Sequence, residues 1–199
     1  MCSSDLLNKN EPIIDLEGLA HHKGSAFGWI GEETQPTQEQ FENNLATELN
    51  KLSNSVIWLE DESQRIGQVR IPNSLFDQIR NSIVYFLDIP KSVRVPHLVK
   101  TYSHFGDEKL EVSILRISKR LGGLNTKLSL EALGRKDYEV IADLTLSYYD
   151  KYYEAGVGKR LPSSVIRIPS NTVDPVINAD HILSHLSKLN HGSHQTHTV

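Results

Sequence analysis

Two runs of acidic residues follow apolar segments, and these are the residues whose types and spacing could do chemistry. One apolar run ends in Asp15 and Glu17, and another ends in Glu60, Asp61 and Glu62. Carboxylates just past a strand can bind a metal, accept a hydrogen bond from a substrate hydroxyl or hold Mg²⁺ through water. Acids in such places are more often helix caps or solvated loop residues, so spacing alone leaves both roles open.

A loop of small and polar residues follows the first acidic pair. Within four residues, His22, Lys23 and Ser25 offer an acid or base, a phosphate partner and a hydroxyl. Glycines around them permit turns and a close approach of the backbone. Most short loops that contain a histidine have no catalytic role, so this pattern names a candidate site without naming a reaction.

Histidines near the end of the chain have the spacing of a metal pair. His181 and His185 are four residues apart, and His191, His194 and His197 follow. No acidic third ligand stands at a defined spacing, so a polar helix face and a flexible tail explain them better. No metal site is predicted.

The elements that must position these side chains can be read from hydrophobic periodicity. Before residue 92 short strands alternate with helices, and after it helices dominate, which indicates an α/β region with a helical appendage. We therefore expect an α/β region at 1–91, a helical region with a late strand at 92–190 and a tail at 191–199. The expected strands end at Ile14 or cover 55–62, 69–71 and 165–168. The expected helices begin at Thr37 and at Asn73, the latter with Ile83 and Phe86 on its apolar face, cover 107–121 and 138–153, and begin again near Asp180.

Charge is segregated along the chain, although the net charge is only −4. Residues 1–93 carry seven basic and 14 acidic residues, whereas residues 94–136 carry nine and four. Any polyanion should therefore bind the middle segment. There, four cations gather on one face of the helix at 107–121 and could contact RNA phosphates or simply form its solvated side. They are Lys109, Arg116, Lys119 and Arg120.

Four tyrosines at positions 148, 149, 152 and 153 could stack on bases, but their helical spacing favours core packing. The chain has one cysteine, Cys2, so it can build neither an internal disulfide nor a cysteine-based metal site. No apolar run approaches the roughly 18 residues of a membrane span. We expect a cytoplasmic protein with no membrane contact.

Five blocks of sequence resemble the C-terminal P-loop domain of the bacterial and archaeal tRNA 2-selenouridine synthase family. They are IDLEGLAHHKGSAFG at 14–28, QPTQEQFENNL at 35–45, WLEDESQRIGQVRIP at 58–72, KRLGG at 119–123 and YYDKYY at 148–153. Their order is that of the family, and together they span most of the chain. The resemblance implies an α/β fold with a truncated, mostly parallel P-loop NTPase-like sheet, flanking helices and a mainly helical C-terminal half.

The resemblance also implies a tRNA-modifying transferase. Family enzymes replace the sulfur of wobble 2-thiouridine with selenium through an S-geranylated intermediate, using selenophosphate and geranyl diphosphate as co-substrates and no covalently bound cofactor. Transferred to this sequence, His22, Lys23, Ser25 and Arg65 face the diphosphate or anticodon pocket. Asp15, Glu17 and Glu60 line it. The catalytic residues are not assigned.

Two departures from the family pattern shape the expected activity. The 199 residues contain no GxxxxGK[ST] phosphate loop and no rhodanese-like segment with a reactive cysteine. We therefore expect a split or truncated member that is weakly active or inactive alone, with tRNA as partner and a rhodanese-domain partner supplied in trans. The alternatives are a non-catalytic RNA-binding or partner-completing module and an inactive gene fragment.

Overall fold

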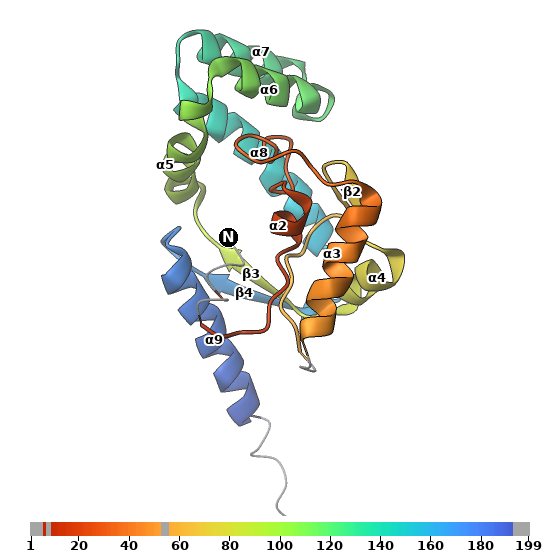
Figure 1. Cartoon of the computed structure of the whole chain (residues 1–199). Coiled ribbons are helices and arrows are strands. Elements are labelled where there is room, and N and C mark those ends of the chain that lie inside the picture. The colour runs from red at the N-terminus through yellow and green to blue at the C-terminus, as the bar shows by residue number, and fades with distance from the viewer. Residues whose placement is uncertain (1–5, 7–8, 53–55, 193–199) are drawn as a thin grey trace, which may run out of the picture.

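The computed structural model describes residue 6 and residues 9–52 and 56–192, apart from the side chains of 188–192 (Figure 1). Helices make up most of it. In chain order the elements are α2 (Leu16–Ala20), α3 (Gln38–Lys51), β1 (Arg65–Ile66), β2 (Val69–Arg70), α4 (Asn73–Asn81), β3 (Val84–Asp88), α5 (Lys91–Tyr102), η1 (Ser103–Phe105), α6 (Asp107–Leu121), α7 (Gly123–Gly134), α8 (Tyr138–Val157), η2 (Pro162–Ser164), β4 (Val165–Pro169) and α9 (Pro175–Gly192).

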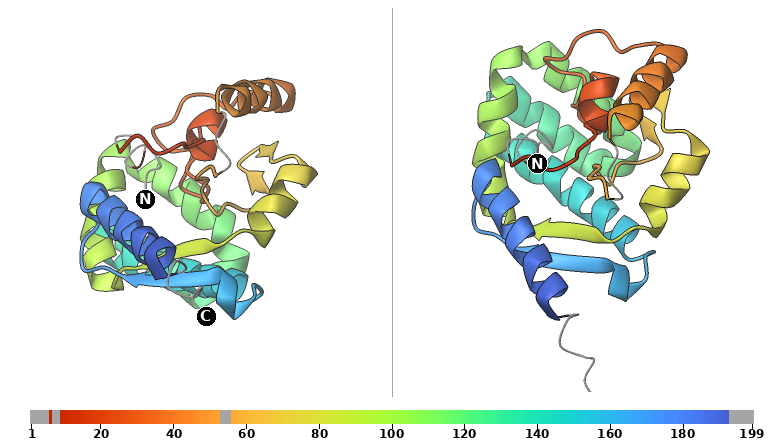
Figure 2. Two further views of the ribbon diagram at one scale, coloured as in Figure 1. Left: turned by 90° about the horizontal axis from the view of Figure 1, so that it is seen from below. Right: turned by 60° about the horizontal axis from the view of Figure 1, so that its bottom comes forward.

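Strand pairing is limited to short segments. Strands β3 and β4 pair in parallel, with Val84 opposite Val165, and Figure 2 shows them side by side at one edge of the fold. A second parallel contact is the isolated bridge between Ile13 and Trp58. Strands β1 and β2 form an antiparallel hairpin. The α/β class is therefore confirmed, but the expected mostly parallel sheet is present only in part.

Two of the expected strands differ from the prediction. Of the segment 55–62, only Trp58 makes a described strand contact, and residues 53–55 lie outside the described residues. The segment at 69–71 pairs as β2, but with the strand just before it, because Gly67 has a φ of +60° and allows a tight turn. The late strand is confirmed as β4.

The helix that begins at Asn73 is shorter than its apolar spacing predicts. It ends at Asn81, so the prediction that Ile83 and Phe86 continue its apolar face is wrong. Residues 84–88 form β3 instead. A short apolar run rich in β-branched and aromatic residues suits a strand as well as a helix, and pairing with β4 decides between them.

Side-chain capping fixes the start of α3 and of α9. The Thr37 side chain accepts a hydrogen bond from the amide of Gln40, as predicted for α3. Helix α6 has the predicted bounds, and α8 runs four residues beyond Tyr153. Helix α9 begins at Pro175 rather than near Asp180, because the Asp174 carboxylate accepts the amides of the first turn.

Two apolar clusters meet at the loop of residues 21–31. One lies under α2, α3 and the hairpin and includes Leu16, Phe41 and Ile66. The other lies among α6, α7 and α8, and Phe27 and Ile30 of the loop belong to it. The loop that carries the candidate residues is therefore anchored in the core of the helical part.

The expected division at residues 91 and 92 stays a prediction. Strand β3 precedes this boundary and β4 follows it, so the parallel pair takes one strand from each expected part. Helix α9 extends to Gly192, and the remainder of the expected tail lies outside the described residues. Within the described part of the chain, no helix is both long and apolar enough to cross a membrane.

A buried arginine joins the end of α4 to the loop after α8. Arg160 is 8% exposed, and its guanidinium donates to the carbonyl oxygens of Ile79 and Ser82 at 3.2 and 3.1 Å. It also donates to the carboxylate of Asp61. These bonds satisfy carbonyls at the helix end that have no partner within the helix.

We expect Arg160→Met to lower the free energy of unfolding by about 2 to 4 kcal/mol, because it leaves several buried carbonyls without their donor and removes one of the two arginines that hold Asp61. Urea denaturation measures the change. The matched control is Arg167→Met, which breaks the exposed pair of Arg167 with Glu154 and should cost clearly less, because exposed ion pairs contribute little to stability. Equal losses in the two variants would contradict the role of Arg160.

Candidate functional site

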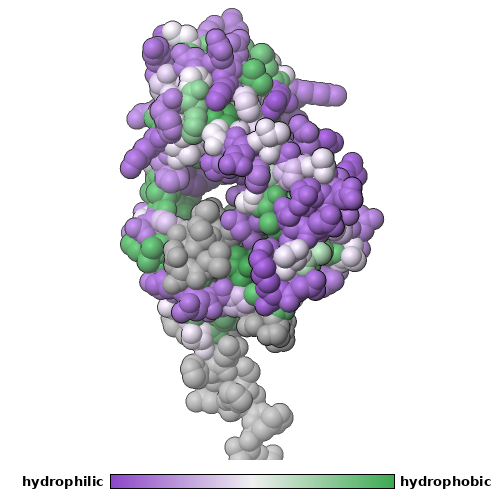
Figure 3. Space-filling model, viewed as in Figure 1, coloured by the Kyte–Doolittle hydropathy of each residue, from purple (hydrophilic) through white to green (hydrophobic). Residues whose placement is uncertain are grey.

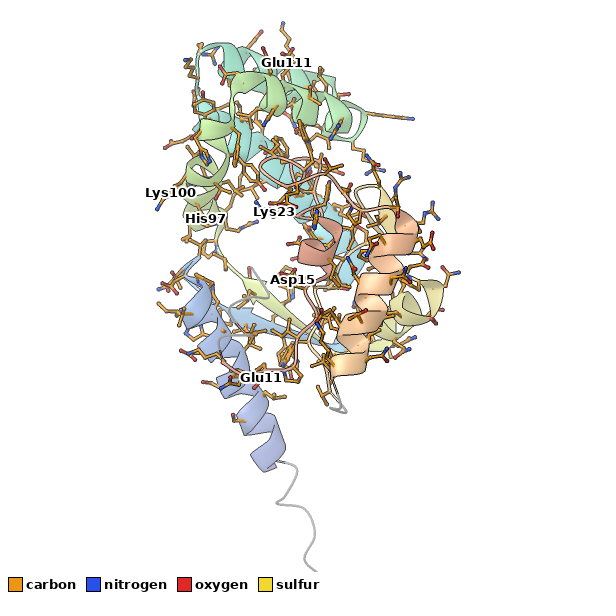
Figure 4. All side chains as sticks on the ribbon, viewed as in Figure 1. Glu11, Asp15, Lys23, His97, Lys100 and Glu111 are labelled. Atoms are coloured by element: carbon orange, nitrogen blue, oxygen red, sulfur yellow. The ribbon has the colours of Figure 1, made fainter. Side chains whose placement is uncertain are left out.

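A cavity of about 850 Å³ lies between the 21–31 loop, α5, α8 and the end of β3. Figure 3 shows an opening in the surface at this place, beneath the α6–α7 hairpin. Figure 4 shows Lys23 and His97 facing the opening from opposite sides, with Asp15 below them. Loop, sheet and helical part thus meet at one hollow.

Two glutamates lie together beside the cavity, and of these Glu62 is buried and Glu17 half-buried. Glu17, on α2, lines the cavity and is hydrogen-bonded to Glu62. Burial and the repulsion of Glu62 raise the pKa of Glu17 to about 8. Burial also raises the pKa of Glu62, while the hydrogen bond from Glu17 opposes that rise. At neutral pH Glu17 is therefore mostly protonated and can donate its hydrogen bond to Glu62.

Strand alternation explains how Glu62 reaches this position. In an extended chain, Glu60 and Glu62 point to one side and Asp61 to the other. Glu60 accepts the amide of Leu16 at 2.9 Å, at the start of α2. Asp61 instead accepts from Arg80 at 3.1 Å and from Arg160. Glu60 and Glu62 therefore support α2 and the candidate site, whereas Asp61 holds the end of α4.

A tight loop fills the space above the acid pair. Gly24 has a φ of +65°, and a Cβ there would overlap the carboxyl group of Glu62. The amides of Ser25 and Gly28 donate within the loop, to Lys23 and Ser25 respectively, and the Ala26 amide donates to the Tyr149 hydroxyl at 2.9 Å. Because these amides are engaged, the loop offers the cavity its side chains rather than a cradle of free N–H groups.

The cations that line the cavity hold carboxylates. Lys23 Nζ lies 2.7 Å from a carboxylate oxygen of Glu32, and both side chains are partly exposed. Arg94, on α5, donates both terminal nitrogens to Asp150 of α8, at 2.7 and 2.9 Å. The second pair is bidentate and fixes α5 against α8, whereas the first pair is a simple surface contact that can exchange.

One wall is aromatic and carries hydroxyl groups. Burial, then the nearby Glu17, raises the pKa of Tyr102 to about 12. Tyr153 is 45% exposed as a whole, but burial of its hydroxyl and the carboxyls of Glu62 and Glu17 raise its pKa too. Both hydroxyls are therefore protonated at neutral pH and can donate hydrogen bonds into the cavity.

Another part of the lining is apolar. It is formed by side chains of the loop and of α5, α6 and α8. They are Phe27, Leu98, Leu110, Ile141, Ala142 and Leu146. A cavity with one apolar wall and a few convergent polar groups is typical of sites for small amphipathic ligands.

The structure brings together four of the seven predicted pocket residues: Asp15, Glu17, Lys23 and Ser25 line the cavity. Asp15 also caps α2, accepting the Gly18 amide at 2.7 Å. The remaining three lie outside the lining. Glu60 holds the start of α2, as described above, and Arg65 lies in the hairpin, where its Nε donates to the Gly67 carbonyl at 2.9 Å.

His22 is the third residue outside the lining, and it is buried. It is 6% exposed, and its Nδ1 has no hydrogen-bond partner among the described residues. Burial, then the positive charge of Arg116, lowers its pKa, so it is neutral at pH 7. It packs against the hairpin near Gly67.

The four predicted RNA-binding cations all lie exposed on α6. Arg116 stacks on the Trp29 ring, with 4.9 Å between guanidinium carbon and ring centroid. Lys109 lies 5.8 Å from the Phe105 ring centroid, and Arg120 is hydrogen-bonded to the Tyr148 hydroxyl. Lys119 lines a shallow groove between α6 and α7. Their binding role stays a prediction.

Sequence reasoning missed the partners of these residues. Glu62 is the hydrogen-bond partner of Glu17, and it stood in the acidic run as one of three equivalent acids. Alternation could have separated it from Asp61. The pairing of Arg94 with Asp150 joins residues 56 positions apart, for which local spacing gives no signal. Among the described residues, no three His, Cys, Asp or Glu side chains gather closely enough to hold a metal ion.

Comparison with known proteins decides the family. The family model described as tRNA 2-selenouridine synthase AAA domain matches residues 2–181. The chain belongs to this family. It is 34% identical over 189 residues to a tRNA 2-selenouridine synthase from Shewanella loihica, a match covering 79% of the chain and 50% of that protein.

Two further proteins named tRNA 2-selenouridine synthase give the same family. That of Nitrosomonas europaea is 42% identical over 101 residues, covering 48% of the chain and 26% of the relative. That of Bdellovibrio bacteriovorus is 31% identical over 196 residues, covering 76% and 51%. The chain spans at most about half the length of these relatives. No solved structure matches it.

The acid pair predicts an unusual dependence of stability on pH. The pKa of Glu17 is higher in the folded protein, about 8, than its ordinary value of 4.5. The protonated carboxyl thus stabilises the fold fully below pH 4.5, and this contribution is lost as pH rises to 8. Glu17→Gln, which resembles the protonated form, should therefore gain stability relative to the unsubstituted chain across this range, by up to about 1.4 kcal/mol per pH unit.

Thermal unfolding of both proteins from pH 5 to pH 8 measures this difference. Glu33→Gln is the matched control, because the Glu33 side chain is 88% exposed and should leave the pH dependence unchanged. A constant difference between the Glu17→Gln variant and the unsubstituted chain would show that Glu17 is ionised throughout.

Proposed function

We propose that this chain carries the transfer site of a tRNA 2-selenouridine synthase, acting on wobble 2-thiouridine and exchanging its sulfur for selenium through an S-geranylated intermediate. Family membership and the printed name of the relatives support the tRNA-modifying part. The observation that carries the geranyl part is the meeting of an apolar wall and a proton-sharing acid pair in one cavity. Selenophosphate and geranyl diphosphate are the proposed co-substrates.

The apolar wall suits a short branched hydrocarbon. Leu98, Leu110 and Leu146 come from three helices and all line the cavity. A volume of about 850 Å³ lies in the usual range for small-molecule sites, roughly 300 to 1,000 Å³. The ten-carbon chain of geranyl diphosphate can be buried there while its diphosphate stays at the polar end, near Lys23.

The polar end can accept the diphosphate by exchange of partners. The pair of Lys23 with Glu32 is 42% and 26% exposed, and exposed pairs contribute at most about 1 kcal/mol. A diphosphate carries more charge than one carboxylate and can displace Glu32 from the lysine. Six acids line the cavity, so further positive charge from outside the described residues is needed for tight binding. They are Asp15, Glu17, Glu32, Asp88, Asp150 and Glu154.

The acid pair can manage the protons of both transfers. In the first, the C2 sulfur attacks C1 of the geranyl group, the diphosphate leaves with the C–O bonding electrons, and N3 of the base loses a proton to the ionised carboxylate of the acid pair. In the second, selenium of selenophosphate attacks C2, and Glu17 protonates the departing geranyl thiolate. Water then cleaves the P–Se bond. A pKa of about 8 suits a group that must both accept and donate near neutral pH.

Activity of the 199-residue chain alone should be weak. Its sequence contains no GxxxxGK[ST] motif, whose backbone amides and lysine would neutralise a diphosphate. We propose that this loop and a rhodanese domain reach the site from another segment or subunit. The second candidate function is a non-catalytic RNA-binding module, favoured by the exposed cations on α6.

Filling the apolar wall tests the proposed ligand. Leu98 is half-buried and lines the cavity, so Leu98→Trp should occupy the hydrocarbon space without disturbing the deeper core. We expect affinity for geranyl diphosphate, measured by calorimetry, to fall at least about tenfold, which corresponds to about 1.4 kcal/mol. Affinity for inorganic diphosphate should stay unchanged, because that ligand needs only the polar end.

The matched control is Leu124→Trp, since Leu124 is 71% exposed on α7 and lies outside the cavity lining. If unsubstituted chain binds geranyl diphosphate no more tightly than inorganic diphosphate, the hydrocarbon has no site here. The RNA-binding module would then be the better reading of the fold.

A further inference from the structure

Four tyrosines form a connected cluster on α8, from its outer side to the cavity. Along one stripe, the ring centroids of Tyr148 and Tyr152 are 6.4 Å apart, and along the other those of Tyr149 and Tyr153 are 6.5 Å apart. The stripes touch at both ends, with centroid separations of 4.9 and 6.0 Å. Figure 1 shows α8 running downward from beneath the α6–α7 hairpin.

Core packing accounts for only half of this cluster. Tyr148 and Tyr149 pack against the apolar cluster of the helical part, and the Tyr149 hydroxyl anchors the 21–31 loop through the Ala26 amide. Tyr152 and Tyr153 are 49% and 45% exposed. Exposing two neighbouring aromatic rings has a cost in water, and neither ring is needed to close the core.

A cation stands at the outer end of the row and acids at the inner end. Arg120, exposed on α6, is hydrogen-bonded to the Tyr148 hydroxyl. At the other end, Tyr153 lines the cavity beside Glu17 and Glu62. A ligand with phosphates at one end, near Arg120, and an uncharged ring at the other end, near the acids, matches this distribution of charge.

The two exposed rings offer faces on which a flat ring can stack. Tyr152 and Tyr153 are neighbours, with 6.0 Å between their ring centroids and an interplanar angle of 77°. Stacked carbon atoms approach to about 3.5 Å, and each half-exposed ring leaves part of its surface open to such contact.

We propose that Tyr148, Tyr149, Tyr152 and Tyr153, with Arg120 at their outer end, form the surface on which a single-stranded RNA loop stacks as one of its bases enters the cavity. Aromatic side chains that stack unpaired bases are the common means of recognising RNA loops. The inference rests on the proposed function for the identity of the base, and it adds the path by which that base arrives.

Binding of labelled RNA to the full chain tests this surface. The probes are an oligouridine of about eight nucleotides, a length typical of one single-strand site, and the same strand paired with its complement. Fluorescence anisotropy should show tighter binding of the single strand. Tyr152→Ala should weaken that binding about tenfold, whereas Tyr152→Phe, which keeps the ring, should weaken it less than about twofold.

Arg120→Ala should reduce the slope of log affinity against log salt by about 0.7, the value for one phosphate contact with a single strand. Leu161→Ala is the control, because Leu161 is 73% exposed and lies outside the cavity lining. Melting temperatures verify that each variant is folded. Equal affinity of the Tyr152→Ala variant and the unsubstituted chain, or equal binding of single strand and duplex, would overturn the proposal.

This outcome is independent of the transfer reaction. If the oligouridine binds through Tyr152 but geranyl diphosphate has no site, the stacking surface stands and the proposed function fails. If the chain transfers to tRNA, with its missing parts supplied, and Tyr152→Ala leaves KM for tRNA unchanged, the proposed function stands and the stacking surface fails.

Discussion

A proton shared between Glu17 and Glu62 is the interaction on which the site depends. It joins the start of α2 to the end of the extended segment after Trp58, two parts of the chain that also meet at the parallel bridge between Ile13 and Trp58 and through Glu60. If both carboxyl groups were ionised, they would repel each other. Protonation of Glu17 and the close approach of the two segments therefore depend on each other. Gly24 completes the arrangement because any side chain there would collide with Glu62.

The cavity exists because the helical part is attached to this arrangement at a few defined contacts. The Tyr149 hydroxyl receives the Ala26 amide, and Phe27 and Ile30 of the same loop are buried among α6, α7 and α8. On the far side, the bidentate pair of Arg94 and Asp150 sets the distance between α5 and α8. Loop and helices are thus fixed relative to each other, and the cavity between them has both an apolar part and a polar part.

Capping residues and hydrophobic periodicity predicted those elements that depend mainly on residues close together in the sequence. The Thr37 cap, the bounds of α6 and the late strand at 165–168 follow from capping and periodicity, and they were predictable. The end of α4 was not, because a strand 80 residues away and Arg160 decide it. Long-range pairing overrode the helical spacing there.

The candidate site, too, was predictable where its residues lie close together in the sequence. Asp15, Glu17, Lys23 and Ser25 stand close together in sequence and line one cavity. Their partners Glu62, Tyr149 and Tyr153 come from distant segments, and only the fold brings them near. Tyr153 also shows where helical spacing misleads. Its spacing predicts a core residue, whereas its ring is half exposed at the site.

The most direct test of this description is a pH titration of the glutamate carboxyl carbons by NMR, with selective isotope labelling. One carboxyl signal should titrate near pH 8 in the unsubstituted chain and vanish in the Glu17→Gln variant. If every glutamate signal in the unsubstituted chain titrates below about pH 5, as ordinary glutamates do, there is no shared proton, and the acid pair cannot organise the site.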